Sequence, residues 1–194
     1  MKKGLFLFLL AAVIMLPLES FALVDGEVYG GYTFSGEVDG TSMEDVTGFS
    51  YGARAHYTTS FLIVTFGIGP YLQYAPLNVE MNVLNNTIEA DMNKMTIGLD
   101  VYNKFDVPLV PLKPYLRYGL AMYDKTTVTV DSTETSESKY FQMYYGGLGL
   151  ALTAIPVPIV DFQIFTEYLY EYSKISDDDN LKGHKVNLGV SVGI

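Results

Sequence analysis

The sequence predicts an all-β protein: an eight-stranded antiparallel up-and-down barrel that crosses a lipid bilayer. Three observations predict it. Segments of about ten residues alternate apolar with small or polar residues along the chain. The alternation continues to the last residue, Ile194, although chain ends usually lose such patterns. The connections between segments are alternately long and polar, then shorter.

The first 22 residues are predicted to be a secretory signal peptide. Lys2 and Lys3 form a charged start, an apolar run extends to Leu18, and small residues place a cleavage site after Ala22. The run is too short for a spanning helix, which needs about 20 apolar residues. We therefore expect one mature domain, residues 23–194, that is exported across the inner membrane.

The composition excludes several classes of function. The chain has 22 acidic and 12 basic residues, and loss of Lys2, Lys3 and Glu19 changes the net charge from -10 to -11. Such an acidic chain is a poor partner for nucleic acid. The absence of cysteine excludes disulfides, thiolate metal ligands and thiol nucleophiles. We expect no cofactor.

Eight segments carry the alternation, and their length suits tilted transmembrane strands of roughly 9–11 residues. Pro70 interrupts the third segment, and because proline cannot donate a ladder hydrogen bond, we expect a bulge near it or an earlier end of pairing. The predicted strands are Glu27–Ser35, Phe49–Thr58, Phe61–Tyr74, Asn93–Asn103, Pro114–Tyr123, Tyr140–Thr153, Ile159–Tyr172 and His184–Ile194.

The two faces of these strands indicate which side meets lipid. One parity is apolar, as in Leu62, Val64, Phe66 and Ile68, whereas the other carries most of the glycines and the charges. A soluble barrel needs bulky apolar residues inside, so this pattern favours lipid outside and a narrow polar lumen. The charged residues and the histidine of the polar face are Glu27, Arg54, His56, Lys94, Asp100, Arg117, Asp161, Glu167 and Glu171.

The connections predict the orientation. Those after strands one, three, five and seven are polar and long, and we expect them to be four extracellular loops, with both chain ends in the periplasm. The alternating "TTVTVDSTETS" predicts a hairpin beyond the membrane. Aromatic residues near strand ends predict interfacial girdles, formed by Phe34, Phe49, Tyr57, Tyr102, Tyr115, Tyr123, Tyr140 and Tyr170.

The sequence resembles the small eight-stranded outer-membrane β-barrel proteins of diderm bacteria, the group of the OmpA transmembrane domain and OmpX. The resemblance covers the mature chain and rests on the strand pattern, on "GFSYGARAHY" and "YYGGLGLAL", and on the terminal strand. It implies contact with outer-membrane lipid and insertion by the barrel assembly machinery. In that family the last residue is typically aromatic, whereas here it is Ile194.

The lumen charges allow two interpretations, a charged conduit or an internal salt-bridge network that fills the barrel. The network is favoured because unpaired charge in a narrow interior is costly and eight strands leave little room for a channel. Arg117 and Glu167 are the expected pair, since both lie in the middle of their strands.

Two further site hypotheses are weaker. His56, near Thr58 and Ser60, and the separate His184 could serve a lipid A-modifying enzyme, but no spacing typical of a catalytic triad accompanies them. The acidic segments 43–45 and 176–180 could bind Ca²⁺, although they lack the spacing of a calcium loop. We expect a non-enzymatic outer-membrane protein, structural or surface-interacting through its loops toward an unidentified extracellular ligand. A lipid A-modifying enzyme and a small pore are the alternatives.

Overall fold

A computed structural model describes residues 23–39, 43–61, 63–83, 86–106, 110–130, 133–157, 160–174 and 180–194. The predicted signal peptide and most of the acidic segment 176–180 lie outside these residues. The described residues contain no helix long and apolar enough to cross a membrane. The strands are β1 (Leu23–Asp39), β2 (Met43–Phe61), β3 (Val64–Val83), β4 (Asn86–Phe105), β5 (Leu112–Val130), β6 (Thr133–Lys139), β7 (Met143–Val157), β8 (Val160–Lys174) and β9 (Asn180–Gly193).

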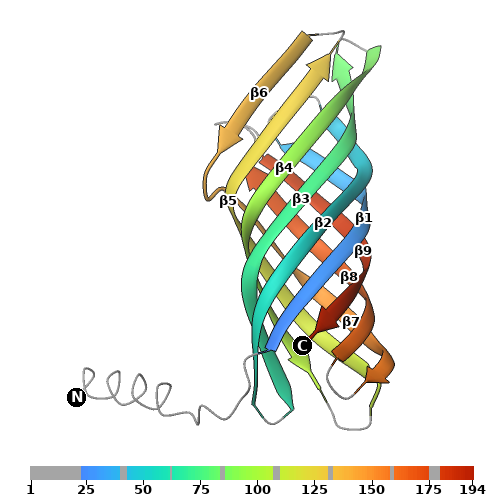
Figure 1. The fold of residues 1–194 in the computed structure, drawn as a ribbon. Coiled ribbons are helices and arrows are strands. Elements are labelled where there is room, and N and C mark those ends of the chain that lie inside the picture. The colour runs from blue at the N-terminus through green and yellow to red at the C-terminus, as the bar shows by residue number, and fades with distance from the viewer. Residues whose placement is uncertain are drawn as a thin grey trace, which may run out of the picture.

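Eight of these strands form the predicted closed antiparallel barrel (Figure 1). The sheet runs β4-β3-β2-β1-β9-β8-β7-β5, and β4 pairs with β5 to close it. β6 pairs only with β5, as the arm that stands beside β5 at the top of Figure 1. The segment after the fifth predicted strand therefore does form a hairpin.

The regular terminal segment is needed for closure. β9 pairs with β1 from Asp25↔Gly193 to Asp39↔Asn180. Beyond this ladder, the amide of Val24 donates to the carbonyl of Ile194 at 3.0 Å, and the amide of Ile194 returns the bond at 2.9 Å. The start of β1 and the end of β9 consequently share one end of the barrel, which we call the terminal end (Figure 1).

The strands are longer than the sequence indicated, and the loops are shorter. β3 continues to Val83 and β4 begins at Asn86, so most of the loop expected after the third strand is paired sheet. The same holds between β1 and β2. The prediction of long loops there was wrong, because strands that leave the membrane can keep pairing as hairpins. The paired sheet at the end opposite the termini includes the end of β1, the start of β2, the end of β3 and the start of β4. We call this sheet, together with the β5–β6 hairpin, the extension.

An apolar belt surrounds the barrel. It is formed by the alternate residues of each strand that the sequence predicted to face lipid. On β3, Phe66, Ile68 and Leu72 are 46%, 53% and 46% exposed, whereas Tyr71 between them is 2% exposed. Exposed apolar side chains in such a continuous belt are matched to hydrocarbon rather than to water.

The polarity of the two faces reverses in the extension, although the same set of alternate residues still points inward. Farther along β3, Leu77 and Val79 point inward and are buried, while Asn78 and Glu80 are exposed. The inward side chains form one apolar cluster, the extension core, made of Val38, Val46, Ala75, Leu77, Val79, Ala90, Met92 and Leu181. An apolar interior beneath a polar outer face is the arrangement expected where water, and not lipid, surrounds a sheet.

Pro70 does not produce the expected bulge. It faces outward and pairs with Leu99 of β4 in an unbroken register. On the other side, pairing with β2 skips from Arg54↔Tyr71 to Tyr57↔Ile68 without a register shift. Because Pro70 has no backbone N–H, a few ladder positions between β2 and β3 are unpaired, but the two strands keep the same alignment on either side of the gap.

Two of the tyrosines predicted for the interfacial girdles lie inside the barrel. Tyr102 and Tyr115 are 2% and 4% exposed, so that assignment was wrong for both. Each lies directly opposite a glycine on a neighbouring strand, Gly67 and Gly149. A Cβ on these glycines would come within 2.3 Å and 2.1 Å of the tyrosine rings. Tyr29, Tyr71 and Tyr145 oppose Gly52, Gly98 and Gly119 in the same way.

This packing makes a matched pair of glycine substitutions informative. We expect Gly149→Ala to destabilise the barrel by about 1–3 kcal/mol, because the new methyl group overlaps the Tyr115 ring. Gly30→Ala should change stability by only a few tenths of a kcal/mol, since the nearest atom to its Cβ is 4.0 Å away. Urea midpoints measured by circular dichroism in micelles test the difference. Equal midpoints would contradict the tyrosine–glycine packing.

Candidate functional site

The centre of the barrel is organised around Arg117 of β5. Its Nη1 donates to Asp100 Oδ1 at 2.5 Å, and its Nη2 donates to Glu27 Oε1 and Oε2 at 2.8 and 2.9 Å. Its Nε lies 2.8 Å from Glu167 Oε2. One guanidinium therefore contacts three carboxylates from β1, β4 and β8, including its expected partner Glu167.

Arg54 of β2 joins two of the same carboxylates. It donates to Glu27 Oε2 at 3.1 Å and to Glu167 Oε1 at 2.7 Å. Its guanidinium lies 3.9 Å from the centroid of the Tyr29 ring, a distance typical of a cation–π contact. Glu167 also accepts from Asn187 at 2.8 Å and from the Tyr115 hydroxyl at 3.0 Å. These contacts compensate the burial of both charges.

His56 lies beside this network. Its Nε2 is 2.5 Å from Asp100 Oδ1, and its ring meets Tyr102 edge-on at 4.9 Å between centroids. The serine of the nearby candidate segment, Ser60, bonds to Thr65 at 2.8 Å. His184 is on the outer wall, where its Nδ1 is 2.6 Å from the Tyr168 hydroxyl. The two histidines therefore lie in different environments and form no common site.

A second polar layer lies toward the extension. Lys94 donates to Glu171 Oε1 at 2.5 Å and lies 3.5 Å from Asp124 Oδ2. Lys185 donates to Glu171 Oε2 at 3.1 Å and to Gln73 Oε1 at 2.7 Å. Two lysines and two carboxylates thus balance in this layer.

A third layer closes the terminal end. Lys113 donates to Asp106 and Asp161 at 3.1 and 3.2 Å. The carboxylates of both partners are about two-fifths exposed, so Asp161 lies at the rim rather than in the interior. Deeper in the barrel, Lys104 donates to Gln163 at 3.0 Å and lies 3.8 Å from Asp25.

The structure places eight of the nine candidate residues inside the barrel and Asp161 at its rim. Several interior residues were missed by sequence reasoning. Asp25 has the parity of Glu27, and extending the first predicted strand by two residues would have found it; Lys185 has the parity of Asn187 and already lies within the predicted last strand. The side chains of the acidic segment 43–45 lie outside the described residues.

Two small voids lie among the described residues of the interior. A void of about 20 Å³ lies between the second polar layer and the extension core, near Gln73, Lys94 and Leu77. Another of about 10 Å³ lies near Glu27, Lys104 and Arg117. Each void holds about one water molecule at most. Among the described residues, side chains therefore fill most of the space around the central charge network and in the second polar layer.

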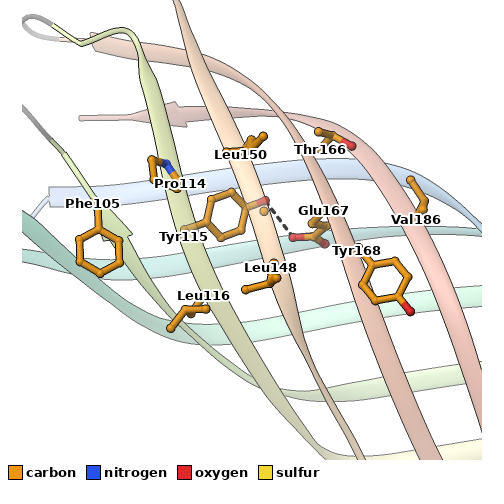
Figure 2. Close-up of a pocket in the computed structure, with 11 residues that line it drawn as sticks. Phe105, Pro114, Tyr115, Leu116, Leu148, Leu150, Thr166, Glu167, Tyr168 and Val186 are labelled. Atoms are coloured by element: carbon orange, nitrogen blue, oxygen red, sulfur yellow. Dashed lines mark hydrogen bonds between the residues drawn. The ribbon is translucent and has the colours of Figure 1, made fainter.

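The outer wall carries a shallow depression of about 500 Å³ across β5, β7 and β8, and another of about 430 Å³ across β1, β8 and β9. Figure 2 shows Leu116, Leu148 and Leu150 along the first depression, with the Tyr115 hydroxyl directed toward Glu167. Its apolar residues belong to the exposed belt. Acyl chains would fill such a depression in a bilayer.

A closed eight-stranded barrel with an apolar outside and a polar inside defines an integral outer-membrane β-barrel protein. The comparison with protein families agrees, since the model for "Outer membrane protein beta-barrel domain" matches residues 8–193. The chain belongs to this family.

Solved structures share the fold at low sequence identity. Neisserial surface protein A superposes with a TM-score of 0.58 at 19% identity, covering 88% of this chain and 96% of that one. The N-terminal β-barrel domain of Pseudomonas aeruginosa OprF gives a TM-score of 0.50 at 18% identity, covering 91% and 100%. No protein of curated function matches the sequence significantly.

The contribution of the charge network to the free energy of unfolding can be measured by replacing Arg117. We expect Arg117→Met to destabilise the folded barrel by about 3–5 kcal/mol, because it leaves Glu27, Asp100 and Glu167 facing one another without their shared cation. The control is Lys139→Met on β6, which loses a partly exposed pair with Glu137 and should cost below about 1 kcal/mol. Urea unfolding in micelles measures both, and equal effects would contradict the central role of Arg117.

Proposed function

We propose that the protein is a non-enzymatic outer-membrane protein that presents a rigid β-sheet extension at the cell surface. The observation that carries this proposal is the extension itself. It projects beyond the apolar belt, has its own buried core, and ends in the β5–β6 arm. An ordered platform of this kind suits contact with an extracellular partner.

The proposed orientation places the terminal end in the periplasm. A cleaved signal peptide would release the new N-terminus there, and Val24 and Ile194 hydrogen-bond at the same end of the barrel. The extension would then lie outside the cell. Outer-membrane lipid would cover the belt, and the barrel assembly machinery would insert the chain. The partner of the extension is not identified by its sequence.

The single-cysteine approach tests this orientation, because the chain contains no cysteine. Ser136→Cys on exposed β6 should react with a membrane-impermeant maleimide on intact cells. Val110→Cys, exposed at the terminal end, should react only after the outer membrane is permeabilised. The reverse pattern would invert the orientation, and labelling of neither variant in permeabilised cells would remove the outer-membrane assignment.

The packed interior argues against the pore alternative. The two voids are separated by layers of paired charges, and the extension core covers one end of the lumen. We expect planar bilayers containing the folded protein to show no stable single-channel steps. Reproducible steps that disappear with a variant of the second layer, such as Lys94→Met, would instead establish conduction through the barrel.

Among the residues that the structure describes, the side chains near His56 do not support the enzyme alternative. Acyl transfer needs a nucleophile within hydrogen-bond reach of a base that a third group orients. Asp100 orients His56, but the hydroxyl of Ser60 is bonded to Thr65 instead. We therefore favour surface interaction over modification of lipid A.

A further inference from the structure

We propose that the barrel interior binds a divalent transition-metal ion of the Zn²⁺ class through Asp25, Glu27 and His56. Each of these residues offers one ligand atom, and the three atoms all lie within 4.8 Å of one another. The side chains are 5%, 6% and 1% exposed. Asp25 lies directly opposite His56 on the neighbouring strand, and Glu27 follows on the same face of β1. The sheet register therefore holds all three in place.

Two buried atoms in this cluster have no partner. His56 Nε2 lies 2.5 Å from Asp100 Oδ1. A carboxylate only accepts hydrogen bonds, so the proton of a neutral His56 ring is on Nε2 and Nδ1 keeps its lone pair. Among the described residues, Nδ1 of His56 and Oδ1 of Asp25 have no hydrogen-bond partner. Buried polar atoms are seldom left unpaired, and a cation would accept both lone pairs at once.

The charge of the surrounding layer also favours a cation. In the part of the interior next to His56, four carboxylates (Asp25, Glu27, Asp100 and Glu167) lie near three basic side chains (Arg54, Lys104 and Arg117). The local set of acidic and basic side chains therefore has one more carboxylate than basic groups, which favours a bound cation over an anion at this place.

The donor set indicates the class of metal. One imidazole nitrogen with carboxylate oxygens suits Zn²⁺ and its neighbours, whereas Ca²⁺ and Mg²⁺ prefer oxygen alone. Bonds of about 2.0–2.2 Å put the ligands of a tetrahedral ion about 3.4 Å apart, so the side chains must close by about an ångström. Glu27 also contacts both arginines, which makes Asp25 and His56 the main ligands. Water would complete the coordination.

Such an ion would join β1 to β2 next to the strand that closes the barrel. A ligand that binds only the folded state raises its stability. The metal would therefore stabilise the pairing of β1 with β2 at the terminal end of the barrel. This structural role does not depend on the proposed surface function.

Zn²⁺ titration of the folded, chelator-treated protein in micelles, followed by calorimetry, tests the proposal. We expect one saturable site per chain and a higher unfolding temperature when Zn²⁺ is bound. Asp25→Asn and His56→Asn should each weaken binding by at least about tenfold, the usual scale for a damaged metal site. His184→Asn is the matched control, because His184 lies on the outer wall and bonds to Tyr168.

A measurement on the wild-type chain keeps the test independent of variant folding. In ¹⁵N-histidine spectra, Zn²⁺ should shift Nδ1 of His56 and leave His184 unchanged, with His184→Asn providing the assignment. The proposal is overturned if Zn²⁺ moves neither resonance, if the chain shows no saturable binding, or if folded His56→Asn binds Zn²⁺ as tightly as wild type. In the last case the acidic surface segments would hold the ion.

Discussion

The lipid bilayer imposes the constraint on which the structure depends: every backbone amide and carbonyl in the hydrocarbon must find its partner within the protein. An open sheet would leave the edges of β1 and β9 unpaired in lipid, which is not tolerated. Pairing of these two strands, completed by the bonds between Val24 and Ile194, removes both edges. β6 keeps a free edge, and it does so in the extension, where water can satisfy the backbone.

Closure with eight strands makes the interior narrow, and the rest of the packing follows from that. Large inward side chains fit only where the neighbouring strand offers no Cβ, which explains why Tyr102 and Tyr115 lie opposite glycines. The same confinement brings Arg54 and Arg117 close enough to share Glu27 and Glu167. Each charge held this way depends on the others, since removal of one member leaves its partners buried and unpaired.

The barrel interior is polar within the apolar belt and apolar in the extension. The difference follows from what surrounds each part of a strand, lipid around the belt and water around the extension. β3 keeps one parity throughout, yet its inward residues change from Tyr71 and Gln73 to Leu77 and Val79 as it leaves the apolar belt. Inside the belt, lipid takes the apolar face and polar groups pair with one another. In the extension, water takes the polar face, and the apolar side chains form a core that stiffens the hairpins.

The sequence by itself determined the strand order, the lipid-facing parity, the number of barrel strands and the need for a regular terminal segment, because these follow from period-two alternation and from closure. It also identified most of the charged interior, since Glu27, Arg54 and Arg117 interrupt otherwise apolar or small-residue strands. The tertiary structure decided the rest. Only the register shows that Tyr102 lies opposite Gly67, that Pro70 disturbs no alignment, and that Asp25 faces His56 across β1 and β2. Such relations depend on which residues of distant segments lie opposite one another. The sequence of one strand does not give this, because a shift of the register by two residues leaves every side chain on the same face.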